Sequence, residues 1–599
     1  MKRQTKRRGA FGAAVLGTFA AFAFLTASAS AQVDAFDWKF DATGATLVGV
    51  KDKKITSARI PAAVDGKPVV AIGNKAFRDC RALETVEFPE GLTAIGNSAF
   101  DRCFALNSVE FPASLETIGG SAFERCEALK TVEFPKNSAL TRLGSWAFSG
   151  CVALETVALP DGLTTLDDFA FSGCRALKTV AFPANLTTLG ERAFGGRAFS
   201  TLELPASLTT VKQAGDLRAE AFSVAPGSTA FRAVDGVLFS ADGKTLVRYP
   251  SRRDAESYRV PDGTEKIGAW AFCGCDALKT VELPNGLTSL GEGAFSGCDA
   301  LETVELPNGL TSLGEAAFQN CDALETVELP DGLKTLGDEA FARCDALKTV
   351  ALPNGLATLG DGAFFGCVAL ETVALPNGLA TLGDKTFWGC ASLKSVVWPK
   401  SATALGDKTF YRCEALREFS TVPDSTAFRA VDGVLFSADG KTLVAYPPGR
   451  DAESYRVPDG TERIGDRAFY ETKRLKSVEF PPGLTTIGAD AFVESELERV
   501  EFPASLRTVG AGAFSWCDLE RVAFSEGLET LGAQAFYNCL ALERVELPAS
   551  LTKIGYEAFE IDFDVDPNPR RDLRLIAPDG SFAAEFAEKN GMKRVAPEK

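Results

Sequence analysis

The sequence contains no histidine. This absence excludes Ser-His-Asp and Cys-His catalytic groups, zinc sites with imidazole ligands, and acid–base catalysis by imidazole. A surplus of positive charge is also missing, because 80 acidic residues outnumber 63 Lys and Arg residues and leave a formal net charge of −17. Since contacts with nucleic-acid phosphates or anionic lipid need surplus basic side chains, the sequence argues against both partners.

A long apolar run occurs only once, near the N-terminus. Five basic residues stand within the first eight positions, an apolar stretch follows from about residue 11 to 25, and small residues lead up to Ala31. This order predicts a secretory signal peptide over residues 1–31. The alternative is an uncleaved membrane anchor over residues 10–31. With the signal removed, we expect an exported protein (extracellular, cell-surface or periplasmic) without stable membrane insertion.

A repeat of 23 residues dominates the rest of the chain. Residues 275–297 read CDALKTVELPNGLTSLGEGAFSG, and residues 298–320 read CDALETVELPNGLTSLGEAAFQN. The Phe of an Ala-Phe or Thr-Phe pair, the marker Phe, labels 19 units and stands at positions 77, 100, 123, 148, 171, 194, 222, 272, 295, 318, 341, 364, 387, 410, 469, 492, 514, 536 and 559. A period of this length with regularly spaced Leu and Val is typical of a leucine-rich solenoid.

One unit shows how such a coil would form. Val304 and Leu306 alternate with polar residues, which predicts a short strand with one buried face. Pro307 ends the strand because it has no N–H to donate, and Leu310 returns to the core. A helical or 3₁₀ turn is expected over residues 315–318. Since no unit can bury its apolar residues alone, stacked units share one core.

The unit AL-x-x-V-x-LP-x-x-L-x-x-IG-x-x-AF-x-x-C resembles the BspA-like leucine-rich repeat of bacterial surface proteins, from about residue 36 to 590. The resemblance implies a curved leucine-rich repeat solenoid of about 19 units of 22–25 residues. It would have a parallel β-sheet on one side, short turns or helical segments on the other, and capped ends. Members are often secreted or surface-attached and implicated in adhesion, and the repeat carries no catalytic residue.

Two identical segments interrupt the array. Residues 231–247 and 428–444 both read FRAVDGVLFSADGKTLV, which predicts two β-hairpins closed by Asp-Gly. We interpret each hairpin as an elaborated rung that carries the stack onward, and the alternative is a protruding ligand loop. The predicted organisation is a signal peptide (1–31), an N-terminal cap (32–72), repeat block 1 (73–222), hairpin insertion 1 (223–266), repeat block 2 (267–419), hairpin insertion 2 (420–463), repeat block 3 (464–564) and a C-terminal cap with a short helix (565–599).

Cysteine would normally indicate disulfides in an exported protein. Fourteen of the 15 cysteines, however, occupy one position of the repeat, and only Cys273 is out of register. Parallel inward side chains have poor geometry for an S–S bond, and Cys is a good small core residue. We therefore expect a ladder of reduced, buried thiols, with disulfides between adjacent coils as the alternative. No metal or other cofactor is expected.

The solvent-facing strand positions form two columns, one of Thr or Ser and one mostly of Glu, as at Glu305 and Glu328. The acidic column is interpreted as a solvated sheet face. The alternatives are a docking stripe for a cationic protein and bridging Ca²⁺. Ala351, Ala374 and Val397 interrupt the acidic column on three successive units.

The same units carry an aromatic residue directly after the marker Phe. These residues are Phe365, Trp388 and Tyr411, and Trp398 also replaces the usual Leu before Pro. An exposed aromatic cluster beside an uncharged patch is typical of an interface hot spot or a sugar platform. These four residues are the candidate ligand-binding site, and the alternative is packing against the hairpin insertion at 420–463.

We predict a non-enzymatic, adhesin-like binding protein that is secreted or displayed at the surface. Its partner would be an extracellular protein or glycan. The alternative is a structural component of the envelope or extracellular matrix that self-associates. An enzyme is disfavoured because histidine is absent and because the acidic residues are periodic, whereas catalysis needs a locally singular cluster.

Overall fold

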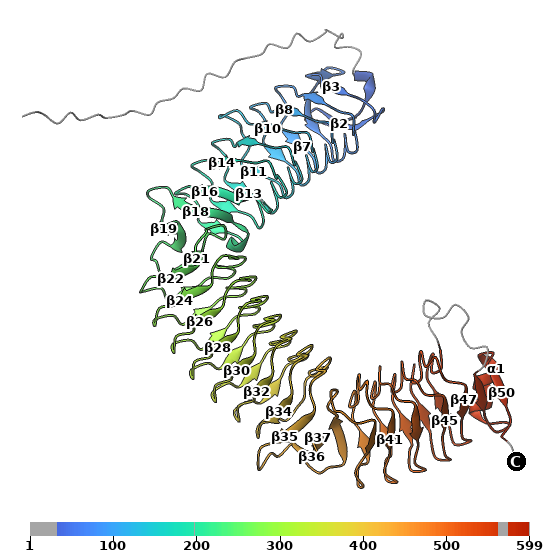
Figure 1. Ribbon diagram of the computed structural model, residues 1–599. Coiled ribbons are helices and arrows are strands. Elements are labelled where there is room, and N and C mark those ends of the chain that lie inside the picture. Colours follow the sequence, from blue (N-terminus) through green and yellow to red (C-terminus); the bar gives the residue numbers. More distant parts are fainter. Residues whose placement is uncertain (1–32, 197, 561–572, 598–599) are drawn as a thin grey trace, which may run out of the picture.

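The computed structural model describes residues 33–196, 198–560 and 573–597, in which the chain stacks into one arc of coils (Figure 1). The leucine-rich repeat solenoid is confirmed, with about 23 stacked turns rather than 19. The marker Phe undercounts because some coils lack it, among them the first coil with β2 (Ala45–Val50) and the last with β49 (Arg574–Ile576). The predicted signal peptide lies outside the described residues.

Each regular coil contributes two short strands to two separate parallel sheets. The first column contains β3 (Ser57–Arg59), β6 (Thr85–Glu87), β8 (Ser108–Glu110), β10 (Thr131–Glu133), β12 (Thr156–Ala158), β14 (Thr179–Ala181), β22 (Ser257–Arg259), β24 (Thr280–Glu282), β26 (Thr303–Glu305), β28 (Thr326–Glu328), β30 (Thr349–Ala351), β32 (Thr372–Ala374), β34 (Ser395–Trp398), β35 (Glu418–Thr421), β39 (Ser454–Arg456), β41 (Ser477–Glu479), β43 (Arg499–Glu501), β45 (Arg521–Ala523) and β47 (Arg544–Glu546). The second column contains β5 (Lys67–Ile72), β7 (Ala94–Ile95), β9 (Thr117–Ile118), β11 (Arg142–Leu143), β13 (Thr165–Leu166), β15 (Thr188–Leu189), β17 (Thr210–Val211), β23 (Lys266–Ile267), β25 (Ser289–Leu290), β27 (Ser312–Leu313), β29 (Thr335–Leu336), β31 (Thr358–Leu359), β33 (Thr381–Leu382), β40 (Arg463–Ile464), β42 (Thr486–Ile487), β44 (Thr508–Val509), β46 (Thr530–Leu531) and β48 (Lys553–Ile554). The expected single parallel sheet is therefore corrected to two, because the returning Leu segment also pairs from coil to coil.

The turn that carries the marker Phe is a third point of contact between coils. The N–H of Phe318 donates to the carbonyl of Ala340 on the next coil, 2.8 Å away. Ala316 and Asn320 adopt left-handed φ angles of 51° and 56°. The helical turn expected over residues 315–318 is wrong, because alternate N–H groups of this turn bond between coils instead of within one.

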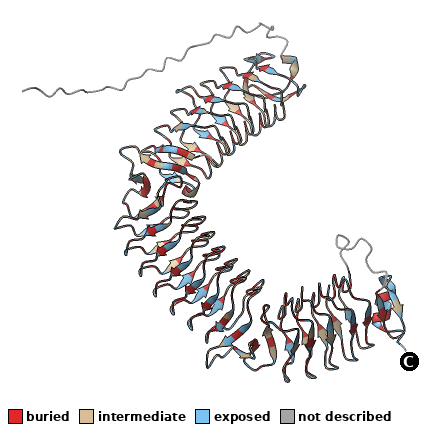
Figure 2. Cartoon of the chain, in the orientation of Figure 1, coloured by how far each residue is buried: buried red, intermediate tan, exposed pale blue. Residues whose placement is uncertain are grey.

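The core is a continuous column of apolar side chains inside each block (Figure 2). The marker Phe rings stack almost in parallel along it. The ring centroids of Phe318 and Phe341 are 5.3 Å apart, and those of Phe341 and Phe364 are 5.6 Å apart. Each ring therefore packs against an identical ring above and below, which fixes the spacing of the coils.

All 15 cysteines carry free thiols, as the reduced-ladder hypothesis predicts. Fourteen are buried, and only Cys273 is half-buried. The Sγ of Cys344 donates to the carbonyl of Phe318, 3.1 Å away, and this contact recurs on neighbouring coils. Burial is the main cause that raises the pKa of Cys126 and Cys151 well above the ordinary thiol value.

Each hairpin insertion is a three-stranded meander that continues the stack. In the first, β19 (Phe231–Val234) and β20 (Val237–Ser240) pair antiparallel, and β20 pairs with β21 (Thr245–Arg248). Strand β21 then pairs parallel with β23 of the next coil, as an elaborated rung should. The second insertion repeats this order with β36 (Phe428–Val431), β37 (Val434–Ser437) and β38 (Thr442–Ala445).

One marker Phe is misassigned. Phe222 lies in strand β18 (Arg218–Val224), opposite Leu202 of β16 (Ala198–Leu204), and not in a turn. The coil before the first insertion is shortened, and its turn is replaced by the 3₁₀ segment η3 (Ala214–Asp216).

Both ends of the stack are covered. At the N-terminus η2 (Val33–Ala35) leads into β1 (Phe36–Phe40), which pairs antiparallel with β2, and β4 (Ala63–Val64) pairs with β5. At the C-terminus α1 (Phe582–Lys589), the short helix expected in the C-terminal cap, buries three Ala residues, and β50 (Lys593–Val595) pairs with β49. These elements shield the terminal coils from pairing with other chains.

We expect Phe341→Ala to lower the free energy of unfolding by about 3–5 kcal/mol, because the substitution removes one ring from the middle of the buried stack. The measurement is denaturant unfolding, with the exposed Thr349→Ala as the matched control. An unfolding free energy equal to that of the control would contradict the ring stack as the main packing element.

We also expect the native protein to show at most one reactive thiol, that of Cys273, because the other 14 are buried in the core. A colorimetric thiol assay before and after denaturation measures this. Disulfides in the non-reduced protein, or several fast-reacting native thiols, would contradict the ladder.

Candidate functional site

Three of the predicted site residues form a row of touching aromatic side chains. The ring centroids of Phe365 and Trp388 are 5.5 Å apart, and those of Trp388 and Tyr411 are 4.4 Å apart. The row continues to Tyr470, whose ring centroid lies 5.0 Å from that of Tyr411. All four side chains are half-buried. We call Phe365, Trp388, Tyr411 and Tyr470 the aromatic row.

Tyr470 was not among the predicted site residues, although Tyr470 also follows a marker Phe directly. The second hairpin insertion separates Tyr411 from Tyr470 along the chain and breaks the 23-residue period. In space the insertion adds only one elaborated rung, so the two tyrosines meet across it. The position of Tyr470 within the repeat therefore indicated that it belongs to the row, but its distance from Tyr411 along the chain concealed this.

The fourth predicted residue, Trp398, is not exposed. Its side chain has 0% exposure, and its Nε1 donates to the carbonyl of Ala402, 3.2 Å away. Its ring packs edge-to-face on Phe428 of the second insertion, with centroids 5.1 Å apart. The prediction that Trp398 lies in an exposed ligand site is wrong, because it occupies the inward strand position of the Leu that it replaces. The alternative of packing against the insertion holds for this residue.

Basic side chains flank the aromatic row. The Lys385 Nζ lies 5.4 Å and the Lys408 Nζ 5.9 Å from the ring centroid of Trp388. The guanidinium carbon of Arg412 lies 5.4 Å from the ring centroid of Tyr411. Cations over aromatic faces are attracted to the rings, so they hold the rings in place and add polar groups to the row.

The interrupted acidic column forms a second, weakly polar surface on the first strand column. Ala351, Ala374 and Val397 are aligned on adjacent strands. They line a shallow groove of about 420 Å³ together with Thr349 and Thr372. Val397 is 41% exposed, so this groove presents apolar atoms to solvent.

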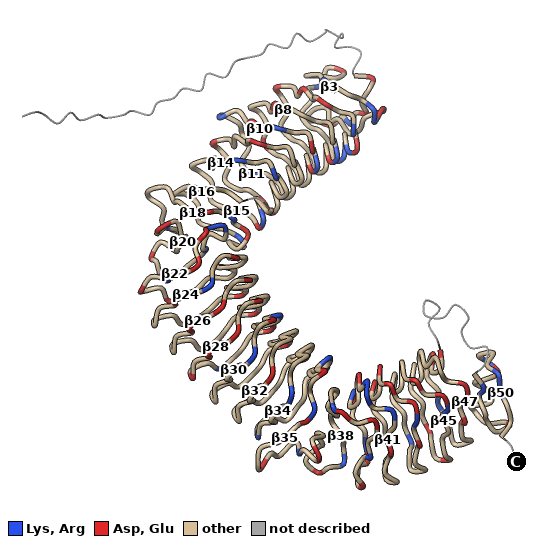
Figure 3. Tube along the Cα trace, in the orientation of Figure 1, with Lys and Arg blue, Asp and Glu red and all other residues tan. Residues whose placement is uncertain are grey.

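On most other coils the strand face carries charged residues, which are balanced by ion pairs between coils. The Nζ of Lys348 lies 3.0 Å from the carboxylate of Glu325 on the preceding coil. Charged residues are spread along the whole arc (Figure 3). Among the residues that the structure describes, no group of three or more Cys, Asp and Glu side chains is arranged to hold a metal ion.

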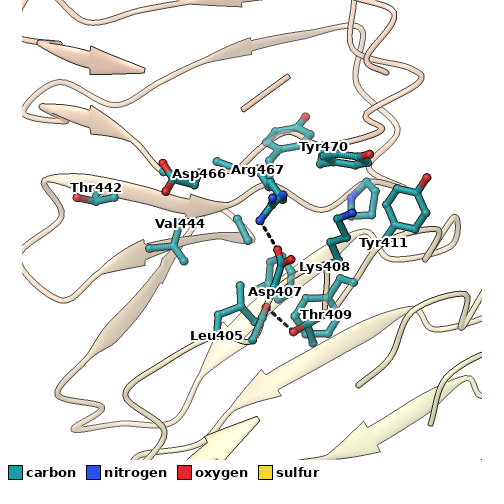
Figure 4. Close-up of a pocket in the computed structure, with 18 of the residues that line it drawn as sticks. Leu405, Asp407, Lys408, Thr409, Tyr411, Thr442, Val444, Asp466, Arg467 and Tyr470 are labelled. Carbon is teal, nitrogen blue, oxygen red and sulfur yellow. Dashed lines mark hydrogen bonds and ion pairs between the residues drawn. The ribbon is translucent and has the colours of Figure 1, made fainter. Parts of the chain in front are cut away.

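A pocket of about 460 Å³ opens where the second insertion joins block 2 to block 3 (Figure 4). Tyr411 and Tyr470 lie side by side on its wall. Arg467 spans the junction, with an ion pair to Asp407 on one side and to Asp490, 3.0 Å away, on the other. This junction pocket therefore adjoins the end of the aromatic row.

Behind the two tyrosines lies a buried carboxyl group, that of Glu471. Burial is the main cause that raises the pKa of Glu471 above its ordinary value, and the hydrogen-bonded carboxyl of Glu494 adds to it. The Nε of Arg412 lies 3.9 Å from the Glu471 carboxylate. Burial and then the charge of Glu471 raise the pKa of Tyr411, so this ring keeps its phenolic proton at neutral pH.

The described part of the chain has no helix that is both long and apolar enough to cross a bilayer. A comparison with curated proteins finds no match. Solved structures that resemble the chain include a leucine rich cell surface protein from Faecalibacterium prausnitzii (27% identity, 57% of this chain and 92% of that chain, TM-score 0.43). Others are a leucine-rich repeat protein from Eubacterium ventriosum (22%, 62% and 93%, 0.47) and the pneumococcal vaccine antigen PcpA (21%, 62% and 96%, 0.41).

Because all three TM-scores lie below 0.5, the assignment depends on the repeat itself. The model of the BspA type leucine rich repeat region matches residues 51–151, 93–215, 251–361, 334–430 and 449–563. These ranges span most of the described coils and include those that carry the aromatic row. The chain belongs to the BspA-type leucine-rich repeat family.

Proposed function

We propose that the chain is a non-enzymatic, adhesin-like binding protein, secreted or displayed at the cell surface, whose contact site is the aromatic row. The observation that supports this proposal is the row itself. Four aromatic rings from four coils touch one another outside the core and remain half-exposed. Large rigid aromatic side chains that stay partly in water are typical of binding hot spots.

The solenoid makes such a row a rigid binding surface. Each ring is fixed by the coil that carries it, so little side-chain entropy is lost when a ligand binds. The basic side chains over the rings of Trp388 and Tyr411 add hydrogen-bond donors to this surface. A surface that combines aromatic rings with polar donors suits an extracellular protein loop or a glycan.

The proposed location follows from the export signal over residues 1–31. It agrees with the family and with the description of the F. prausnitzii relative as a cell surface protein.

A second candidate function is an envelope or matrix component that self-associates. The observation that favours it is the groove lined by Ala351, Ala374 and Val397, which presents apolar atoms to solvent on the strand face. Exposed apolar patches on repeat proteins often mark contacts between chains.

The test of the proposed function is binding of the purified chain from residue 32 to extracellular-matrix proteins and glycans. We expect the triple variant with Phe365→Ala, Trp388→Ala and Tyr411→Ala to weaken a specific interaction by at least about 30-fold. One hot-spot aromatic side chain contributes on the order of 2 kcal/mol. The matched control replaces three exposed aromatics on other coils, Trp146, Trp516 and Tyr556, by Ala.

Equal loss in the control and the row variant would contradict the row as the site. Sedimentation velocity runs beside the binding assay. Concentration-dependent association that Val397→Glu abolishes, without any specific binding to the panel, would replace the proposed function by the structural one.

A further inference from the structure

The two hairpin insertions give the chain two copies of one junction, 197 residues apart. The strands of the insertion agree closely in the two copies, but 12 of the 19 residues that line the pocket differ between them. Two of these differences change the size of a central side chain. Arg248 of the first copy corresponds to Ala445 of the second, and Trp270 corresponds to Arg467. The chain therefore contains its own comparison between a filled and an open junction.

Arg248 fills the first junction. Its side chain has 0% exposure, and its guanidinium donates to the carbonyls of Leu217 at 3.1 Å and Trp270 at 2.8 Å. It also donates to the carbonyl of Cys273 at 3.1 Å. Trp270 closes the remaining space, because it packs so tightly on Gly215 that a Cβ there would lie 2.3 Å from the Cβ of Trp270.

Ala445 leaves the second junction open. The side chain of Ala445 is a single methyl group, whereas Arg248 at the corresponding position of the first junction has a long side chain. A pocket of about 460 Å³ lies beside Ala445. A volume in this range accommodates one or two sugar rings, and it lies within the usual range for small-molecule sites. The pocket is thus a local feature of one junction and not of the repeat.

Four of the five charged groups that line this pocket are in ion pairs, and the fifth, Lys408, lies over the ring of Trp388. Arg467 pairs with Asp407 and Asp490, and Arg463 pairs with Asp466 at 2.8 Å. Among the described residues, no acceptor lies within hydrogen-bonding reach of the buried Nε of Arg467. Paired charges offer donors and acceptors without a strong net charge, which favours a neutral, hydroxyl-rich ligand over an ionic one.

Aromatic side chains form one wall of the pocket. Tyr411 and Tyr470 line the pocket with ring centroids 5.0 Å apart (Figure 4). The ring centroid of Trp388, which is not among the lining residues, lies 4.4 Å from that of Tyr411. A sugar ring has apolar C–H faces and a rim of hydroxyl groups, so it needs aromatic faces together with planar polar side chains. The second junction supplies both, and the aromatic row extends them outward.

We propose that the second junction binds a neutral sugar residue of a glycan, whose next residue lies on Trp388. This inference rests on the proposed function and names the ligand class of that site. Tyr411 and Tyr470 would contact the ring faces, while Arg467, Asp407 and Asp466 would bind the hydroxyl groups.

The test places the two large side chains of the first junction at the corresponding positions of the second. Wild type and the Ala445→Arg, Arg467→Trp protein are compared by saturation-transfer NMR and calorimetry. The probes are glucose, galactose, mannose and N-acetylglucosamine, their β-linked disaccharides, and the acidic probes glucuronate and N-acetylneuraminate. The matched control is Ala438→Arg, which adds the same side chain to an exposed turn of the same insertion. A second variant, Tyr470→Ala, removes part of the wall without filling the pocket, and circular dichroism and thermal melting show whether each variant is folded.

We expect wild type and the control to bind at least one neutral probe, with at least 10-fold weaker binding in the filled variant and in Tyr470→Ala. Binding of acidic probes alone, equal binding in the filled variant, or no saccharide binding by wild type would overturn the inference. A matrix protein that wild type binds and the aromatic-row variant loses, with no saccharide bound, would leave the proposed function standing and remove only the sugar site.

Discussion

The structure depends on the register of one coil on the next. Each coil of about 23 residues places its two short strands, its marker Phe and its thiol directly over the same groups of the preceding coil. Backbone hydrogen bonds at the strands and at the Phe turn hold this register, and the ring stack fills the space between them. A coil that slipped by one residue would lose all three contacts together, so the array is specified far more strongly than any one unit could specify itself.

The same register decides where function can reside. A position that is repeated in sequence becomes a row in space, so the Thr column and most of the acidic column extend over many coils and mark no particular place. A feature that is found at only one place arises where the sequence differs from the repeat pattern. The aromatic row departs from it after the marker Phe on three successive coils, and the second junction departs from the first at Ala445 and Arg467. Because Tyr411 lies in both, the two departures form one continuous surface.

Much of this could be predicted from sequence, because a repeat converts spacing directly into stacking. The solenoid, the buried thiols and the elaborated rungs followed from period and polarity. The errors share a cause, because a sequence pattern alone does not show whether a side chain points into the core or into solvent. Phe222 matches the marker dipeptide but lies in a strand, and Trp398 matches an aromatic cluster but points into the core. Tyr470 and the pocket required knowing that a long insertion occupies only one rung, which only the three-dimensional arrangement shows.

The central claim is that stacking places the aromatic row in solvent and Trp398 in the core. Hydroxyl-radical footprinting of the native protein, read residue by residue by mass spectrometry, tests this without any ligand. Trp388 and Trp398 have the same intrinsic reactivity and lie on neighbouring coils, so only exposure separates them. The account predicts rapid oxidation of Trp388, Tyr411 and Tyr470 and almost none of Trp398 until the protein unfolds. Equal oxidation of Trp388 and Trp398 in the native state would contradict it.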